Sequence, residues 1–302
     1  MPRVVRVATV SWYSNEGIPG SHEGNRREME AHLARAALEQ PDIVLLPEAF
    51  GVAGLPVEEY AAHAEPIPGP STEMCARYAR EQGMYVICPL YERAEEGVHN
   101  TAVVLGRDGA VVGKYRKRHP TLPELEIGVR PGQEAGVLDL DFGRIGLMIC
   151  FDVFYPYTAR ELGAAGVEII FWASVYAGGF PLRMCAYENR CFVVSSQNRA
   201  CGCIIDRAGR VVAESGTYRN LVAADVDLEE TVFCTDFNAG LLDAIKRKYG
   251  REVHVTMLHD EGVFTLRSLR AEVTVAQIIE EFGLEPLDDY LRRSASHPAM
   301  GQ

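Results

Sequence analysis

The sequence contains no apolar stretch long enough to span a bilayer. Its first residues, Met1-Pro2-Arg3, lead directly into a short β-type segment from Arg3 to Ser11. They lack the cationic segment followed by an apolar core that is typical of a secretion signal. We therefore expect a cytoplasmic protein that has no membrane partner.

Positive charge and paired cysteines are also scarce. The 30 lysines and arginines are outnumbered by 42 aspartates and glutamates, which gives a formal net charge of -12. This charge argues against nucleic acid as a partner. Among the eight cysteines, Cys201 and Cys203 form the only close pair, and histidines are not clustered near them. We expect reduced thiols, no metal site and no cofactor.

No Pro/Ser-rich linker or run of charge divides the 302 residues. With 47% hydrophobic residues, the chain is able to bury a substantial core. We expect one domain over residues 1–234, followed by a C-terminal extension over 235–302. The extension is expected to pack on the same domain or on a neighbouring subunit.

Strand and helix patterns alternate along most of the chain, which predicts an α/β or α+β fold with a large sheet. Helical spacing of apolar residues occurs at 23–39, 71–82, 157–165 and 182–189, and again at 241–249 and 275–282. Predicted strands cover 3–11, 42–46, 84–91, 100–105, 110–115, 144–150, 168–173, 191–197, 204–205, 211–212 and 221–226, with shorter ones at 253–258 and 262–266. An internal echo of strand, turn and strand indicates two similar halves.

Three of the predicted strands end at a side chain that is able to react. Glu48 follows Leu45-Leu46-Pro47, Lys117 follows the strand at 110–115, and Cys150 closes the apolar run from Gly143. Functional groups of α/β proteins concentrate at such strand ends. Taken singly, each residue could be a packed thiol or a solvated charge. Their joint occurrence favours a catalytic interpretation.

The order Glu, Lys, Cys, in these sequence contexts, resembles the nitrilase superfamily of carbon-nitrogen hydrolases. The motifs that carry the resemblance are Leu45 to Phe50, Gly113 to Lys117, and Cys150-Phe151-Asp152 with Pro156, and the match covers roughly Val4 to Val226. The resemblance implies a four-layer αββα sandwich. It also implies a homo-oligomer, a dimer or larger.

The resemblance further implies the chemistry. Cys150 would attack the substrate carbon and form a thioester, Glu48 would move protons, and Lys117 would stabilise the developing oxyanion. A Cys-His pair with His119 is the less favoured alternative, because the neighbouring Pro120 and the family pattern indicate a structural role. Asp152 is expected to cap the turn after the nucleophile or to pair with a basic group.

Relatives carry a second glutamate seven residues after the lysine, and Glu124 has this spacing. Glu126 on the same segment is the competing candidate. We expect this segment to be an extended loop whose approach is fixed by Pro123, with Glu124 facing the pocket and Glu126 pointing elsewhere. We favour Glu124 as the residue that orients Lys117 or the substrate.

The substrate is expected to be a small amide or ureido compound. The nitrile-hydrolysing relatives commonly have Trp-Glu after the cysteine, whereas this chain has Phe151-Asp152, which favours an amide or N-carbamoyl bond. Phe151, Trp172 and Tyr176 are the candidate substrate-binding residues. A substrate carboxylate would need another cation, such as Arg183 or Arg199. A nitrilase, or a small-molecule-binding member of the fold without catalysis, stays as an alternative.

Overall fold

The computed structural model describes residues 3–12, 21–198, 201–216, 218–297 and 299. The chain divides into two compact units, one formed by Val5–Val226 and the other by Asp227–Gln302 with Met1–Val4. We expected the division after residue 234. It comes earlier because the strand β13 (Thr231–Cys234) pairs with a strand of the C-terminal unit, Val263–Ser268.

The Val5–Val226 unit contains two six-stranded mixed sheets. The first has the order β12-β1-β2-β3-β4-β5 and the second β11-β10-β9-β8-β7-β6. The strands of the first sheet are β12 (Leu221–Asp227), β1 (Val4–Val10), β2 (Ile43–Leu45), β3 (Tyr85–Ala94), β4 (Gly97–Leu105) and β5 (Val111–Arg116). Those of the second are β11 (Val211–Glu214), β10 (Cys203–Ile205), β9 (Phe192–Gln197), β8 (Ile169–Ser174), β7 (Gly143–Ile149) and β6 (Gly136–Leu140).

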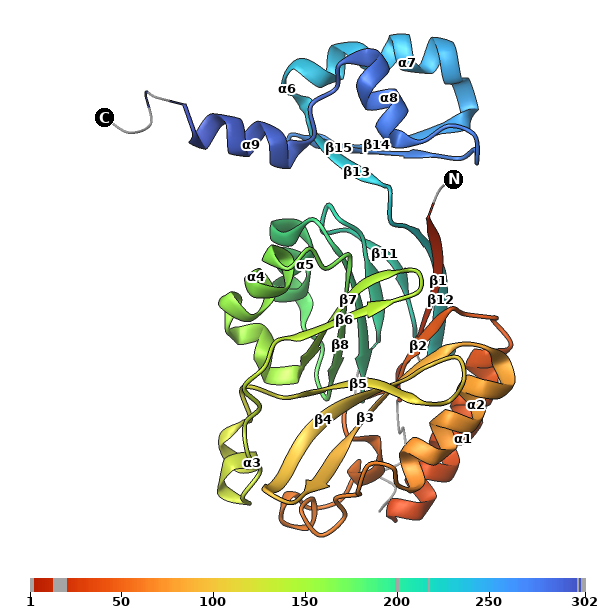
Figure 1. Ribbon diagram of the computed structural model, residues 1–302, viewed down its shortest axis with the longest axis vertical. Helices are drawn as coiled ribbons and strands as arrows, with labels where there is room; N and C mark the ends of the chain where they lie inside the picture. The colour runs from red at the N-terminus through yellow and green to blue at the C-terminus, as the bar shows by residue number, and fades with distance from the viewer. Residues whose placement is uncertain (1–2, 13–20, 199–200, 217, 298, 300–302) are drawn as a thin grey trace. The chain divides into compact units, whose positions relative to one another are not determined.

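Each sheet has three parallel strands joined by helical crossovers. Strands β1, β2 and β3 are parallel, as are β7, β8 and β9. Parallel neighbours need a crossover connection, and helices supply it. The crossovers contain α1 (His22–Ala37) and α2 (Pro70–Gln82) in the first half, and α4 (Pro156–Ala164) and α5 (Gly179–Asn189) in the second. This repetition matches the two similar halves expected from the sequence (Figure 1).

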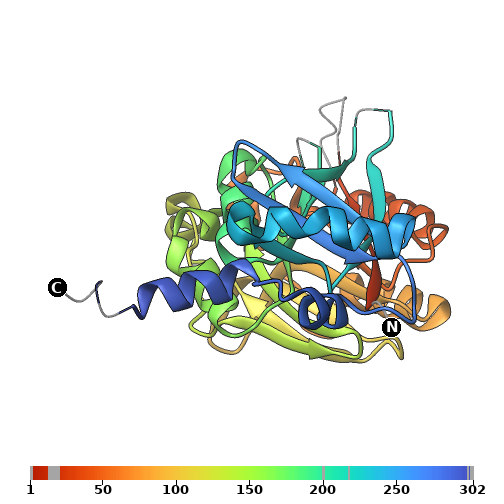
Figure 2. The same cartoon turned by 90° about the horizontal axis from the view of Figure 1, so that it is seen from above.

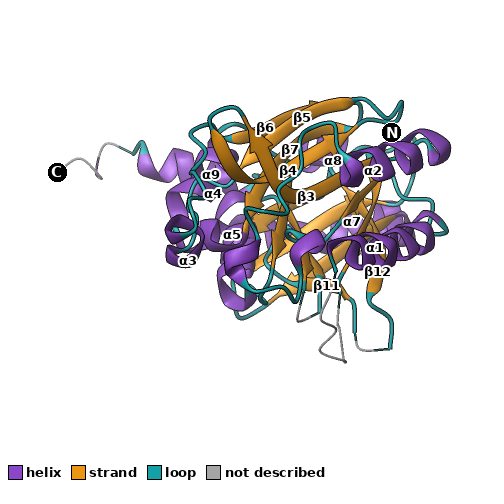
Figure 3. Ribbon diagram, turned by 90° about the horizontal axis from the view of Figure 1, so that it is seen from below, coloured by secondary structure: helices purple, strands orange, loops and turns teal. Residues whose placement is uncertain are grey.

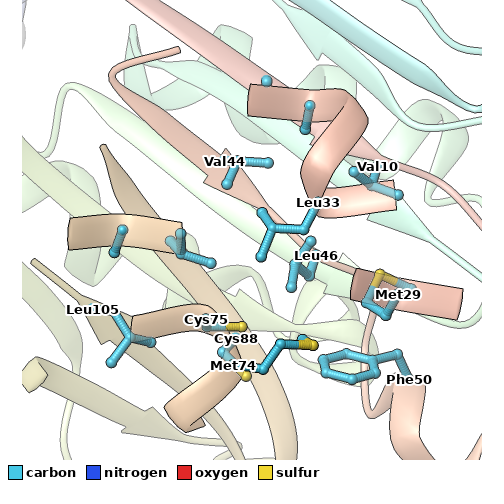
Figure 4. Packing of buried hydrophobic residues seen from close by; sticks show 14 of the residues in the cluster. Val10, Met29, Leu33, Val44, Leu46, Phe50, Met74, Cys75, Cys88 and Leu105 are labelled. Carbon is cyan, nitrogen blue, oxygen red and sulfur yellow. The ribbon is translucent and has the colours of Figure 1, made fainter. Parts of the chain in front are cut away.

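The helices cover the outer faces of the sheets. On the first sheet, Leu33 of α1 and Met74 of α2 pack against Val10, Val44 and other residues that alternate along the strands (Figure 4). On the second sheet, residues of α4 and α5 pack against Ile170 and Trp172 of β8, among others. Figure 3 shows the strands lying between α1 and α2 on one side and α4 and α5 on the other.

The inner faces of the two sheets meet. In β1, Ala8 and Val10 point toward the helices, so that Thr9 points the opposite way and donates its hydroxyl hydrogen to Ser195 O of β9 at 2.8 Å. Ser196 Oγ returns a hydrogen bond to Val10 O. The α/β sandwich, with its helix, sheet, sheet and helix layers, is thereby confirmed.

Short helical turns complete the Val5–Val226 unit. They are η1 (Phe50–Val52), η2 (Val57–Glu59), α3 (Leu122–Glu126) and η3 (Cys150–Phe154). The sequence pattern did not predict α3 or β6.

The C-terminal unit has a three-stranded antiparallel sheet of its own. Its order is β13-β15-β14, and Phe233 and Phe264 of this sheet pack with Ile245 and Ile278 of two helices. The unit is coloured cyan to blue in Figure 2. Its remaining elements are α6 (Thr235–Asn238), η4 (Ala239–Leu241), α7 (Leu242–Tyr249), η5 (Gly250–Glu252), β14 (Val253–Leu258), β15 (Val263–Ser268), α8 (Val275–Phe282) and α9 (Leu287–Ala295). Neither β13 nor α9 was predicted.

Among the helices of the described residues, none combines the length and the apolar character that crossing a membrane requires.

The packing of α1 leads to a stability prediction. Leu33 is fully buried in the helix-sheet core, whereas Leu38, at the end of α1, is 81% exposed. We expect Leu33→Ala to lower the free energy of unfolding by about 2–5 kcal/mol, because it leaves a cavity. Leu38→Ala should change it by less than about 0.5 kcal/mol. Both tryptophans lie in the Val5–Val226 unit, so urea unfolding followed by tryptophan fluorescence measures this unit. Equal effects of the two substitutions would contradict this account of the core.

Candidate active site

Four of the residues singled out in the sequence line one cavity of about 390 Å³. They are Glu48, Lys117, Glu124 and Cys150. Glu48 lies three residues after β2, Lys117 directly follows β5, and Cys150 directly follows β7. Ends of strands from both sheets therefore deliver these side chains to one place.

The Lys117 ammonium lies between two carboxylates. Its Nζ is 3.1 Å from Glu48 Oε1 and 2.8 Å from Glu124 Oε2, and the side chain is 1% exposed. Burial alone would lower the pKa of Lys117, but the charges of Glu48 and Glu124 outweigh burial and raise the pKa above its ordinary value. Lys117 therefore keeps its positive charge inside the cavity.

Only one of the two carboxylate oxygens of Glu48 has a hydrogen-bond partner among the described residues. Oε1 accepts hydrogen bonds from Lys117 Nζ and from Asn100 Nδ2, the latter at 2.8 Å. Oε2 is buried and has no hydrogen-bond partner among the described residues. Burial raises the pKa of Glu48, and Lys117 offsets part of that rise. A carboxylate of raised pKa with a free oxygen is suited to accepting a proton.

Glu124 is a full member of the site, while Glu126 is not. Glu124 Oε2 accepts from Lys117 Nζ and from Thr121 N at 2.7 Å, and the side chain is buried. Burial tends to raise the pKa of Glu124, but Lys117 and these hydrogen bonds lower it overall. Glu126 is exposed. The two side chains diverge because they lie two residues apart on the short helix α3, and the extended loop that we expected is wrong.

Two further residues of the site were not predicted. Asn100 Nδ2 donates to Glu48 Oε1 and to Glu124 Oε1, both at 2.8 Å, and Tyr91 Oη donates to Glu124 Oε1 at 3.0 Å. Tyr91 pairs with Asn100 across β3 and β4, and Lys117 N donates to Asn100 O at 2.8 Å. The three residues therefore form a row across adjacent strands. The register of the β4-β5 hairpin is the signal that could have revealed Asn100.

Cys150 is held in an unusual backbone conformation. Its φ is 45°, in the left-handed region, and the same φ occurs at Ala49, the residue after Glu48. Such conformations cost on the order of 1–3 kcal/mol in non-glycine residues and cluster at functional sites. Burial first, and then the nearby Glu48 charge, raise the pKa of the Cys150 thiol to about 12, against the opposing effects of Lys117, Ser174 and the Val175 backbone.

Asp152 forms hydrogen bonds that hold the turn beginning at Cys150. It is fully buried, and its Oδ2 accepts from Ile149 N and from Tyr115 Oη, both at 2.8 Å. Its Oδ1 lies 2.8 Å from His119 Nδ1, and the His119 ring stacks on Tyr155 with centroids 3.8 Å apart. The carboxylate thus ties the Cys150 turn to the segment around Lys117.

The cavity wall differs from the one that the sequence led us to expect. Among the described residues of the lining, Phe151, Trp172 and Tyr176 are absent. Trp172 is buried against α4 and α5, and its Nε1 donates to Cys150 O at 3.0 Å, so it supports the backbone at Cys150. Tyr176 packs edge-on against Trp172 and stacks with Phe154, and Phe151 also packs on Phe154.

The wall comes instead from the segment after Glu48 and from six single residues elsewhere in the chain. The lining residues besides Glu48, Lys117, Glu124 and Cys150 are Trp12, Asn25, Ala49, Val52, Ala53, Gly54, Val57, Tyr60, Tyr91, Thr121, Val175 and Asn198. Of the two arginines considered for a substrate carboxylate, Arg183 is absent from this lining and donates to Gly209 O at 2.9 Å. Arg199 lies outside the described residues.

Within the described part of the chain, no three His, Cys, Asp or Glu side chains are grouped so that they could hold a metal ion.

Comparisons with known proteins agree with this geometry. The omega-amidase NIT2 of Bos taurus is 29% identical over 229 residues, which are 66% of this chain and 81% of that protein. A nitrilase of Pyrococcus abyssi is 34% identical over 181 residues, 57% of this chain and 68% of that protein.

A solved structure shares the fold. Nit3 of Saccharomyces cerevisiae, a member of branch 10 of the nitrilase superfamily, superimposes with a TM-score of 0.65 at 19% identity, covering 82% of this chain and 94% of that one. The family model described as carbon-nitrogen hydrolase matches residues 6–234, well over half of the chain. The protein therefore belongs to the carbon-nitrogen hydrolase family, within the nitrilase superfamily.

Proposed function

We propose that the protein is an amidase that hydrolyses the carbon-nitrogen bond of a small amide or N-carbamoyl compound through a thioester on Cys150. The observation that carries the proposal is the buried Lys117 ammonium, held by Glu48 and Glu124 in the same cavity as the Cys150 thiol. A protein that only binds small molecules has no need for this set.

Acylation begins with attack of Cys150 Sγ on the amide carbon. The carboxylate of Glu48 takes the thiol proton as the sulfur-carbon bond forms, so that a free thiolate is not required beforehand. The carbonyl oxygen becomes anionic, and the Lys117 ammonium stabilises it. Glu48 then returns the proton to the leaving nitrogen, the carbon-nitrogen bond breaks, and ammonia or an amine departs.

Deacylation uses the same groups in reverse roles. Glu48 removes a proton from water, whose oxygen attacks the thioester carbon, and Lys117 again stabilises the oxyanion. The carbon-sulfur bond then breaks, the sulfur takes the proton back from Glu48, and the carboxylic acid is released. Glu124 and Asn100 do not touch the reacting atoms in this scheme. They hold Lys117 and Glu48 in position.

A nitrilase is the second candidate, and the similarity to the Pyrococcus abyssi nitrilase supports it. A nitrile would form a thioester through the same cysteine, with two waters consumed in place of one. Phe151-Asp152 after the nucleophile favours the amidase. Ammonia release from a panel of amides, ureido acids and nitriles distinguishes the two.

A cytoplasmic location and a homo-oligomeric state, dimer or larger, stay predictions from the sequence. The packing of the C-terminal unit against a neighbouring subunit likewise stays a prediction from the sequence.

The nucleophile gives the central test. We expect Cys150→Ala to lower ammonia release from the best amide of the panel by at least about 10³-fold, because no other group can form the thioester. Cys234→Ser, which changes a thiol of the C-terminal unit, is the matched control and should retain activity. Tryptophan fluorescence checks that both variants fold. Substantial steady-state hydrolysis by the Cys150→Ala protein excludes the mechanism.

The thiol itself should be neutral at rest. Because burial and Glu48 raise its pKa to about 12, Cys150 should contribute no thiolate absorbance near 240 nm between roughly pH 6 and pH 9. The measurement is the difference in absorbance between the wild-type and Cys150→Ser proteins during a pH titration. Glu48→Gln is a useful third protein, since removal of that charge should lower the pKa of the thiol. A thiolate signal with a midpoint near neutral pH would show that the thiol is activated before substrate binds.

The two glutamates of α3 provide a matched pair. Glu124→Gln removes one of the two charges that hold the Lys117 ammonium, and we expect kcat to fall by about 10²-fold. Glu126→Gln changes an exposed side chain and should leave kcat within about twofold. Steady-state kinetics on one amide decides between them, and a larger loss for Glu126→Gln would refute the assignment of Glu124.

A further inference from the structure

We propose that this cavity accepts amides whose acyl group is apolar and uncharged and discriminates against analogues that carry a carboxylate. The inference deepens the amidase function proposed above and rests on it. Three features of the described lining support it: its charge, its free polar atoms and its apolar wall.

The charges that line the cavity disfavour a second anion. Lys117 is the only lysine or arginine among the described lining residues, and two carboxylates already contact its ammonium. Glu48 and Glu124, when ionised, outnumber this one cation. The described lining therefore presents net negative charge to a substrate carboxylate in a partly desolvated space, where repulsion is poorly screened.

The free polar atoms of two lining residues are hydrogen-bond acceptors. Asn198 Nδ2 donates to Glu48 O at 2.7 Å, which fixes the orientation of the carboxamide, since only its nitrogen is able to donate to a carbonyl. Asn198 Oδ1 is then left buried, without a partner among the described residues, as is Glu48 Oε2. These oxygens suit the N–H groups of a primary amide. A carboxylate, which only accepts, gains nothing from them.

Several donors in the lining are already engaged. Trp12 Nε1 donates to Glu28 Oε1 at 2.8 Å, Tyr91 Oη donates to Glu124 Oε1, and Thr121 Oγ1 donates to Glu124 Oε2 at 3.0 Å. An acyl group that carries a carboxylate would have to compete for them. The amide group of a substrate therefore meets free hydrogen-bond acceptors. A carboxylate at the other end of the substrate meets donors that already have partners.

Much of the remaining wall is apolar. Val52, Ala53, Val57 and Val175 contribute aliphatic side chains. With its N–H directed to Glu28, Trp12 adds an indole ring to the same lining. Burial of apolar surface is favourable, so an alkyl or aryl acyl chain gains affinity here, whereas a carboxylate would lose its hydration.

The test compares two amides of equal length that differ in charge. Succinamate carries a carboxylate at the end opposite to the amide, and 4-oxopentanamide replaces one carboxylate oxygen by a methyl group. We expect kcat/KM for 4-oxopentanamide to exceed that for succinamate by at least about tenfold at neutral pH. A ratio near one, or a preference for succinamate, would overturn the inference.

A cation introduced into the cavity wall provides a second test, because it should improve hydrolysis of the substrate that carries a carboxylate. Val57, on η2, lines the cavity and is half-buried. Val57→Lys should raise kcat/KM for succinamate by about tenfold relative to Val57→Met, which adds length without charge. Tryptophan fluorescence unfolding checks that both variants fold. If the lysine gives no advantage over methionine, charge is not what excludes the carboxylate.

A binding measurement separates this inference from the amidase proposal. Trp12 lines the cavity, so quenching of tryptophan fluorescence in the Cys150→Ser protein reports binding of each amide without turnover. Tighter binding of 4-oxopentanamide with no turnover by the wild-type protein would support the selectivity and refute the hydrolase. Tighter binding and faster turnover of succinamate would refute the selectivity alone.

Discussion

The contact of one buried ammonium with two buried carboxylates is the interaction on which the rest of the site depends. Removal of one partner of a buried ion pair leaves an uncompensated charge, at a cost on the order of 3–5 kcal/mol. Lys117 directly follows β5, Glu48 lies beyond β2, and Glu124 lies on α3, so all three segments must be placed correctly at once. The row of Tyr91, Asn100 and Lys117 across β3, β4 and β5 provides that placement, because the register of the sheet sets the position of each side chain.

Two residues next to this ion cluster adopt strained backbone conformations. Ala49 and Cys150 both adopt left-handed conformations that cost free energy, and each adjoins or carries a reacting group. Asp152 makes four polar contacts, to Ile149, Tyr115 and His119, and Trp172 donates to Cys150 O. These contacts stabilise the turn that carries Cys150, the proposed nucleophile. A thiol fixed in this way does not have to search for its orientation when substrate binds.

The sequence predicted those parts of the structure in which apolar residues recur with the spacing of a strand or a helix. It did not predict the parts that lack such a repeating pattern. Strand ends pointed to Glu48, Lys117 and Cys150, and the alternation of strands and helices predicted an α/β or α+β fold with a large sheet. The sandwich itself was implied by the family resemblance. The alternation within β8 could also have shown that Trp172 shares a face with Ile170 and points toward the helices, away from the cavity. The lining residues from Ala49 to Tyr60 lie on loops and on the short turns η1 and η2, which are too short to show a periodic pattern. Asn100 looks like an ordinary strand residue until its partner strand is known. Such positions follow from tertiary pairing, which local sequence does not encode.

Catalysis and recognition use different resources in this cavity. In the proposed mechanism the Lys117 ammonium serves the developing oxyanion, and its contacts with Glu48 and Glu124 offset its attraction for a more distant substrate carboxylate. Under the selectivity proposed above, recognition depends on the wall, much of which comes from the segment between Ala49 and Tyr60. This segment is separate from β5 and β7, which Lys117 and Cys150 directly follow. Changes in that segment can therefore alter which acyl groups fit while the ion cluster and the nucleophile stay in place. This separation allows one chemistry to serve different amides on the same scaffold.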